Sequence, residues 1–166
     1  IPMYQIAAKV GSVFQNPRTQ FFNVDTDSEI AFGIENEARP PKKLAERVEQ
    51  TTEDLRIQKL RNRNIFELSG GEKQRVAIGS AIASGKKILI FDEPTSGLDY
   101  RHMLEVSDNL NRLKELGKSL FLITHDPELI YKCCTYLLFI QGSKVLWHRP
   151  MDGEAVSLLR AFFSHA

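Results

Sequence analysis

The chain has 166 residues, of which 42% are hydrophobic and 26% charged, a composition typical of a folded globular protein that excludes intrinsically disordered, collagen-like and disulfide-scaffold proteins. Lysine and arginine (22) nearly balance aspartate and glutamate (21), so the net charge of +1 gives no electrostatic reason to expect nucleic acid as a partner. At about 150 residues per domain, the length predicts one domain or a fragment of a larger one.

The first third of the chain predicts one strand followed by a mostly helical insertion. A strand-like stretch covers residues 10–15, and a polar segment punctuated by prolines follows it. Helical spacing then resumes with three apolar residues, Leu44, Val48 and Leu55. Nothing before this insertion has the features of a signal peptide.

The sharpest local signal lies at residues 68–75, where a helix is predicted to begin with Ser69, Gly70 and Gly71. A helix start offers unpaired N–H groups and a partial positive charge, and glycines let an anion approach the backbone closely. The pattern therefore predicts a phosphate site. A purely structural alternative is that Ser69 and Glu72 form a capping box, although two glycines at a helix start are costly unless something needs the space.

A short apolar run, residues 88–91, ends in Asp92 and Glu93. Such a run predicts a strand of a parallel sheet that is buried on both faces. Carboxylates at the carboxyl end of this strand lie where open α/β folds bind ligands. Asp92 could hold Mg²⁺ and Glu93 could polarise a water molecule. Adjacent strand residues point to opposite faces, so the alternative is that one of them is only a solvated strand end.

A helix and a second apolar run follow, which completes a strand–helix–strand unit. The helix has leucines at 110, 113 and 116 and closes at Gly117, and the run covers residues 120–123. Directly after it comes His125, which in a parallel sheet lies near Asp92 and Glu93 and can donate a hydrogen bond to a phosphate oxygen. The alternative is a structural histidine.

The last part of the chain predicts a short helix after Asp126 and Pro127, and a third buried parallel strand at residues 137–140. A hairpin turn at residues 141–144 and a closing helix with apolar residues at 156, 159 and 163 follow. The apolar runs are far shorter than the ~20 residues of a membrane-spanning helix. Adjacent Cys133 and Cys134 fit neither a disulfide framework nor a zinc site, which favours a reduced, cytosolic chain.

Together these segments resemble the ATPases of the ABC family. The match consists of five motifs in the family's order: the Q-loop at residues 13–17, the signature at 68–74, Walker B with the adjacent glutamate at 88–93, the D-loop at 96–99 and the switch histidine at 125. The segment from Phe14 to Phe22, with Glu29 to Gly33 after it, is more narrowly similar to the ATPase subunits of energy-coupling-factor importers for vitamins and cobalt or nickel.

The resemblance implies an α/β fold, an incomplete P-loop NTPase-like domain with a parallel sheet, flanking helices and a helical subdomain. By it, residues 1–15 are the end of an N-terminal part with the Q-loop strand, residues 16–68 form the helical subdomain, and residues 69–166 carry the signature helix, Walker B, the D-loop and the switch histidine.

A phosphate loop of the form G-x-x-x-x-G-K-[ST] is absent from the sequence. The nearest string, Gly79 to Lys87, has the wrong spacing and lies ahead of the Walker B strand, so we reject it as a decoy. In the family this loop precedes the Q-loop, and we therefore expect the chain to be the C-terminal part of a longer protein, inactive alone, with an exposed sheet edge that invites association.

Site roles follow from the resemblance residue by residue. Family ATPases pair head to tail and enclose each ATP between the Walker motifs of one domain and the signature of the other. Four residues are thereby implied to contact the partner's nucleotide: Ser69, Gly70, Gly71 and Gln74. Catalytic roles are implied for Glu93, His125 and Gln15, Mg²⁺ binding for Asp92 and Gln15, and the D-loop role for Asp99. Glu72 is a departure, because the family more often has glutamine there.

The implied partners are a second ABC ATPase domain and a transmembrane transporter subunit, with ATP and Mg²⁺ as cofactors, no nucleic acid, and a peripheral position on the inner face of the cell membrane. Phe21 and Phe22 are candidates for a groove that receives the membrane partner, although burial statistics favour plain core residues. Two alternatives remain: an ABC ATPase acting on DNA, for which residues 16–68 lack long heptads, and a non-catalytic binding fragment.

Overall fold

A computed structural model describes residues 2–7, 9–13, 21–35 and 40–164. The chain divides into two compact units, residues 1–124 and residues 125–166, and each is described by itself. No helix in the described ranges is long and apolar enough to cross a membrane.

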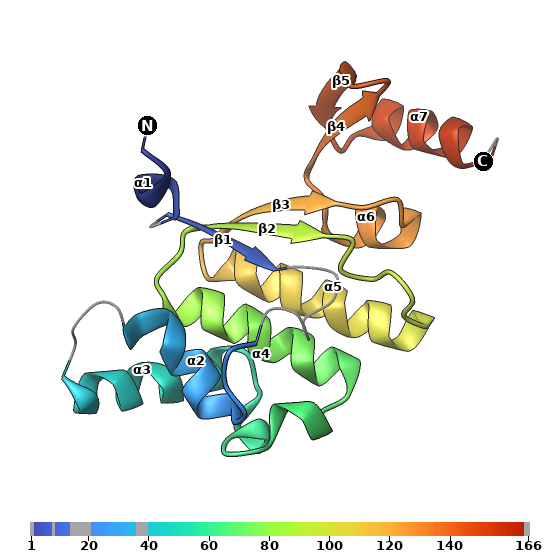
Figure 1. Cartoon of the computed structure of the whole chain (residues 1–166). Coiled ribbons are helices and arrows are strands. Elements are labelled where there is room, and N and C mark those ends of the chain that lie inside the picture. The colour runs from blue at the N-terminus through green and yellow to red at the C-terminus, as the bar shows by residue number, and fades with distance from the viewer. Residues whose placement is uncertain (1, 8, 14–20, 36–39, 165–166) are drawn as a thin grey trace. The chain divides into compact units, whose positions relative to one another are not determined.

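The first unit contains a parallel sheet and a group of helices (Figure 1). Its elements are α1 (Met3–Ala7), β1 (Val10–Val13), α2 (Thr26–Glu35), α3 (Pro41–Asp54), the 3₁₀ turns η2 (Gln58–Leu60) and η3 (Ile65–Glu67), α4 (Gly70–Ala83), β2 (Ile88–Asp92), α5 (Tyr100–Glu115) and β3 (Ser119–Ile123).

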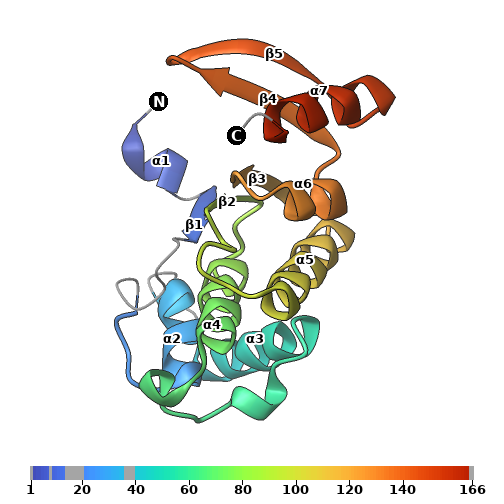
Figure 2. The ribbon, with the colours of Figure 1, turned by 90° about the vertical axis from the view of Figure 1, so that its right-hand side faces the viewer.

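The sheet has the order β1-β2-β3, with all described strands parallel. Val13 lies opposite Phe91, and Asp92 lies opposite Ile123. The strand–helix–strand unit predicted from the sequence is therefore confirmed as β2, α5 and β3. Helices α4 and α5 lie along one face of this sheet in both ribbon views (Figures 1 and 2).

Helix α5 forms where the sequence predicts it, because Leu110 and Leu113 recur on one buried face. Gly117, at φ +74°, ends it. The Lys118 N–H donates to the Leu113 carbonyl at 3.0 Å, which is the hydrogen bond of a Schellman cap.

The expectation that residues 120–123 are buried on both faces is wrong in this structure. Phe121 and Ile123 are 60% and 55% exposed, on the strand that pairs only with β2 among the described strands. The sequence pattern identifies the strand but not whether its second face is covered.

The helical part packs α2 and α3 against α4. Ile30 and Ile34 of α2 and Val48 of α3 are buried there. A Cβ built on Gly79 would lie 3.3 Å from the Ile30 side chain, so glycine at this position allows α2 to pack closely. This packing role, inside α4, agrees with the rejection of residues 79–87 as a phosphate loop.

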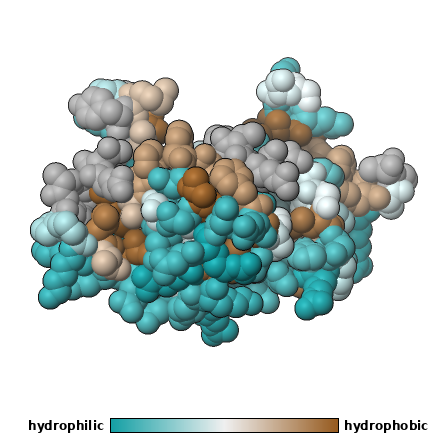
Figure 3. Space-filling model, turned by 60° about the horizontal axis from the view of Figure 1, so that its bottom comes forward, coloured by the Kyte–Doolittle hydropathy of each residue, from teal (hydrophilic) through white to brown (hydrophobic). Residues whose placement is uncertain are grey.

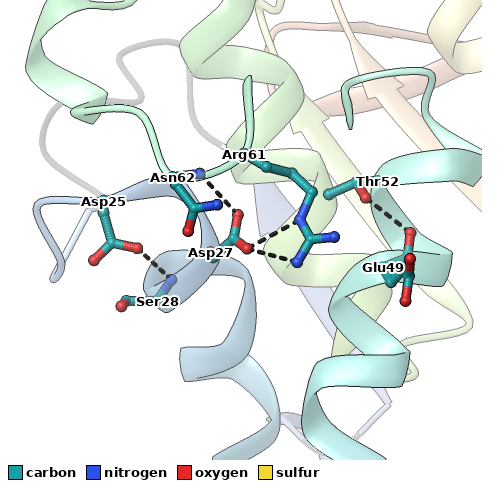
Figure 4. Close-up of polar contacts among 7 residues, drawn as sticks. All are labelled: Asp25, Asp27, Ser28, Glu49, Thr52, Arg61 and Asn62. Carbon is teal, nitrogen blue, oxygen red and sulfur yellow. Dashed lines mark hydrogen bonds and ion pairs between the residues drawn. The ribbon is translucent and has the colours of Figure 1, made fainter. Parts of the chain in front are cut away.

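A polar cluster fixes the loop after η2 onto α2. The Arg61 guanidinium donates two hydrogen bonds to Asp27 at 3.0 and 2.9 Å, and the Asn62 N–H donates to the other carboxylate oxygen at 3.2 Å (Figure 4). Asp25 accepts from the Ser28 N–H at 2.9 Å at the start of α2. The loop that leads toward the signature helix is thereby held to the helical part.

The second unit contains α6 (Pro127–Cys133), β4 (Tyr136–Gln141), β5 (Lys144–Pro150) and α7 (Gly153–Phe163). Its core joins Ile130, Leu137, Ala155 and Leu159. Asp126 caps α6 by accepting from the Leu129 N–H at 3.2 Å, as predicted.

The third apolar run, residues 137–140, is not a buried parallel strand. It lies in β4, which pairs antiparallel with β5, and Leu138 and Ile140 are exposed. The predicted hairpin turn is confirmed. Both of its central residues, Gly142 and Ser143, have positive φ (+56° and +61°), as a tight turn matching the strand twist requires.

Candidate functional site

The start of α4 combines a capping box with an open surface. The Ser69 hydroxyl accepts from the Glu72 N–H at 3.3 Å, and the Glu72 carboxylate accepts from the Ser69 N–H at 2.9 Å. That backbone N–H and the nearby Arg63 guanidinium hold the pKa of Glu72 below its usual range. The structural alternative considered for this motif is therefore present.

The capping box does not account for the glycines. Outside its chain neighbours and its own helix backbone, Gly70 has no atom within 4 Å of where a Cβ would lie, and a Cβ at Gly71 would meet only ordinary contacts with His102 and Glu105. Neither glycine has a positive φ. The described chain therefore gives no packing reason for glycine at position 70, and the predicted phosphate site at this helix start stays a prediction.

The start of α5 lies beside the start of α4. Asp99 caps α5 by accepting from the His102 N–H at 3.0 Å, and its second oxygen lies 2.9 Å from the His102 ring. These hydrogen bonds lower the pKa of Asp99. Arg75 of α4 pairs with Glu105 of α5 at 3.0 Å. The D-loop aspartate thus lies on a helix that is tied to the signature helix.

The carboxyl end of β2 presents two carboxylates in different settings. Asp92 is exposed and Glu93 half-buried. Glu93 has a positive φ of +46°, and its N–H donates to the Ile123 carbonyl at 2.8 Å. The left-handed backbone at Glu93 had no signal in the sequence, because Pro94 restricts the preceding residue mainly away from helical backbone.

Gln74 is placed differently from the other signature residues. It is 5% exposed, and its side-chain amide donates to the Pro94 carbonyl at 2.8 Å. The amide faces the chain's own turn after β2, and the implied contact of Gln74 with a partner's nucleotide stays a prediction. Ser69 and Gly70 are exposed, whereas Gly71 and Gln74 are buried.

His125 is the exposed first residue of the second unit. Its proximity to Glu93 therefore stays a prediction. Gln15 lies outside the described residues. Within the described ranges, no three His, Cys, Asp or Glu side chains come together as a metal site, and Asp92 is the implied Mg²⁺ ligand that the structure describes.

An exposed aromatic pair lies on the helical part. Phe22 is 75% exposed and stacks on Phe32 with ring centroids 4.8 Å apart. Glu29, itself buried, accepts hydrogen bonds from the N–H groups of Phe22 and Asn23 at 3.0 and 2.9 Å. The prediction that Phe22 is a core residue is wrong. Nothing in the sequence indicated that Phe32 is the second ring of this exposed pair. On the face that Figure 3 draws, apolar areas lie among largely hydrophilic surface.

The comparisons with known proteins agree on one family. The family model described as ABC transporter matches residues 2–96. An ABC transporter ATP-binding protein of Treponema denticola is 47% identical over 141 residues, covering 85% of this chain and 29% of that protein. The energy-coupling factor transporter ATP-binding protein EcfA of Malacoplasma penetrans is 35% identical over 150 residues, covering 90% of this chain and 52% of EcfA.

The fold also matches a solved structure, cbiO1 from Clostridium perfringens, described as part of the ABC transporter complex cbiONQ. The TM-score is 0.84 at 27% identity, covering 98% of this chain and 67% of cbiO1. The match confirms the predicted partial P-loop NTPase-like fold. The chain spans 26% to 56% of the length of four of the curated relatives it matches. The motif order, the fold and these relatives agree, and the chain belongs to the ABC transporter family of ATP-binding proteins.

Proposed function

We propose that the whole protein to which this chain belongs is the ATPase subunit of an importer of the energy-coupling-factor type, driving vitamin or metal-ion uptake. The observation that carries the proposal is the open start of α4, where Gly70 has no neighbour within 4 Å of a Cβ position. Similarity to EcfA and cbiO1 supports the importer class.

In this proposal the ATP-contacting surface is the start of α4, where Ser69 and Gly70 are exposed and Gly71 is buried. Gly70 and Gly71 offer backbone N–H groups, and Ser69 its hydroxyl, at the positive end of α4 to the phosphates of an ATP held by a second ATPase domain. Asp99, at the start of the neighbouring helix, takes the D-loop role at the same dimer interface. The pairing is head to tail, so each site needs both domains.

The chain's own carboxylates serve the other site. Glu93 acts as the base that polarises the attacking water, and His125 donates a hydrogen bond to the γ-phosphate. Asp92, exposed at the end of β2, fits the oxygen-donor chemistry that Mg²⁺ prefers, with Gln15 as the second implied ligand. Bound Mg²⁺ supplies charge neutralisation on the phosphates.

The membrane partner docks on the aromatic pair Phe22 and Phe32. Two stacked rings, one of them 75% exposed, give an apolar contact of the kind that protein partners bury. The subunit is then peripheral, on the cytoplasmic face of the membrane, through that partner.

The catalytic assignment predicts the effect of Glu93→Gln in the whole protein. We expect ATP binding to be kept and kcat to fall at least about 100-fold, because the amide cannot accept the proton from water. Steady-state hydrolysis and equilibrium ATP binding measure the two effects. Glu115→Gln, an equally conservative change at an exposed position of α5, is the control. Normal turnover in Glu93→Gln would refute the role.

The 166-residue chain alone is expected neither to bind Mg-ATP tightly nor to hydrolyse it, because its sequence holds no phosphate loop. Equilibrium dialysis tests this directly. Micromolar binding to the chain alone would contradict the expectation.

A further inference from the structure

The turn after β2 holds its glutamate in an unfavourable backbone conformation. Glu93 has φ +46°, a region that residues with a side chain adopt at a cost. Such a conformation persists only where the surroundings fix it, and it is concentrated at functional sites. The contacts that fix this turn therefore decide where the Glu93 carboxylate lies.

Backbone hydrogen bonds fix the turn at both of its ends. The Glu93 N–H donates to Ile123 at 2.8 Å, and the Ser96 N–H donates back to the Glu93 carbonyl at 3.1 Å. These bonds close the turn on itself and onto β3. The peptide between Pro94 and Thr95 has a further contact, which comes from outside the turn.

That contact is the Gln74 side chain of α4. Its amide nitrogen donates to the Pro94 carbonyl at 2.8 Å, 20 residues along the chain, and the bond is buried. Gln74 is 5% exposed and the neighbouring Thr95 6% exposed. A hydrogen bond shielded from water in this way is stronger than an exposed one, and its loss leaves a buried carbonyl without that donor.

We infer that Gln74 is a positioning residue for Glu93: its buried amide holds the Pro94 carbonyl and thereby keeps the strained Glu93 backbone, and the carboxylate it carries, in the hydrolytic geometry. The inference rests on the proposed role of Glu93. It assigns Gln74 a role through a contact inside its own domain.

Three substitutions in the whole protein test the inference. Gln74→Met keeps a side chain of similar length but has no donor. Gln74→His keeps an N–H donor at a similar reach from the backbone. Arg47→Met is the matched control, because Arg47 donates to the Ile82 and Ala83 carbonyls at 3.2 and 3.3 Å, at the other end of the same helix.

We expect Gln74→Met to lower kcat by roughly tenfold to 100-fold, the effect of a misplacement near 1 Å at a catalytic group, with the KM for Mg-ATP changed less than about twofold. Gln74→His should recover most of the lost kcat. Arg47→Met should lower the melting temperature while leaving kcat unchanged. If Gln74 had only a structural role, the losses of kcat in Gln74→Met and Gln74→His would follow their losses of thermal stability.

A second measurement uses the 166-residue chain itself. Amide hydrogen exchange of Ser96, whose N–H bonds to the Glu93 carbonyl, should become faster in Gln74→Met and stay unchanged in Arg47→Met. Unchanged kcat and unchanged exchange in Gln74→Met would overturn the inference. If Glu93→Gln also hydrolyses ATP normally, the proposed function fails. If Gln74→Met is normal but Glu93→Gln is inactive, Glu93 keeps its catalytic role and the positioning role of Gln74 is refuted.

Discussion

Position 72 holds glutamate where the family more often has glutamine, and the Glu72 carboxylate caps the start of α4. It accepts the Ser69 N–H at 2.9 Å and lies 3.9 Å from Arg63. The carboxylate is thus turned back onto its own helix start, where a negative charge stabilises the helix. A capping anion and a phosphate site can occupy the same helix start because they use different N–H groups.

The lowered pKa of Glu72 makes its contribution depend on pH. A carboxyl whose pKa is lower in the folded than in the unfolded state adds stability above its ordinary pKa, and loses it as the pH falls through the lowered value. We expect Glu72→Gln to lower the unfolding free energy by about 0.5 kcal/mol at pH 7, because glutamine keeps the capping hydrogen bond but not the charge, and to change nothing at pH values below both pKa values. Urea unfolding of both chains at several pH values measures the difference. A cost that is equal at all pH values would contradict a charged cap.

Single residues in this site differ in how well the sequence predicts them. Gly70 is predicted to belong to an anion site because glycine at a helix start is costly unless an approaching group needs the space, and its exposed position is consistent with that prediction. Gln74 could not be placed, because it lies on nearly the same side of the helix as Gly70 but one turn further along. At that depth α4 is covered by the turn after β2, and only the tertiary structure shows this.

Helix α2 and the segment before it depend on one buried carboxylate. Glu29 is 3% exposed and accepts from two backbone N–H groups and from the Asn23 side chain at 3.3 Å. A buried charge with three donors is strongly held, and its removal leaves those donors unpaired. The position of Phe22 against Phe32 therefore depends on Glu29.

We expect Glu29→Ala to lower the unfolding free energy by about 2 kcal/mol. We also expect Glu29→Ala to weaken binding of the membrane partner more than Phe32→Ala does. Denaturant unfolding and co-purification with the transmembrane subunit measure the two effects. Glu46→Ala, on the exposed side of α3, is the control. Full partner binding by Glu29→Ala would show that the aromatic pair does not need this support.

The positions of the helices, strands and turns were largely predictable from the sequence, but the burial of the strands and their pairing partners were not. Asp126, Gly117 and the turn at residues 141–144 carry local chemistry that fixes a helix start, a helix end and a hairpin. An apolar run such as residues 137–140 indicates only that some of its side chains are buried. The same run serves a buried parallel strand or, as here, an antiparallel strand with one face exposed, and local sequence does not distinguish the two.

The first unit as a whole leaves an apolar sheet edge exposed. β3 pairs with β2 alone among the described strands, and Phe121 and Ile123 on it are more than half exposed. Exposed strand edges with apolar side chains are sites of association. Among the described strands β3 is, like β1, an edge strand of the sheet, and the expectation of an exposed edge where the missing strands belong stays a prediction.

We expect the 166-residue chain to self-associate as its concentration rises, and Phe121→Lys to reduce this, because a charge on an edge strand opposes pairing. Sedimentation velocity over a concentration series measures the effect. Tyr100→Lys is the matched control, since Tyr100 is 61% exposed but lies at the start of a helix. A chain that stays monomeric, or an equal effect of both variants, would contradict the role of the edge.

The close approach at Gly79 has a mechanical consequence. A Cβ on Gly79 would lie 3.3 Å from the Ile30 side chain, so α2 and α4 pack closely there, and we expect the two helices to move together. From Gly79 to Gly70 the helix runs roughly 14 Å at 1.5 Å per residue. Since packed interiors are hard to compress, we expect a displacement of α2 at Phe32 to be transmitted to the start of α4, where we propose that phosphate binds.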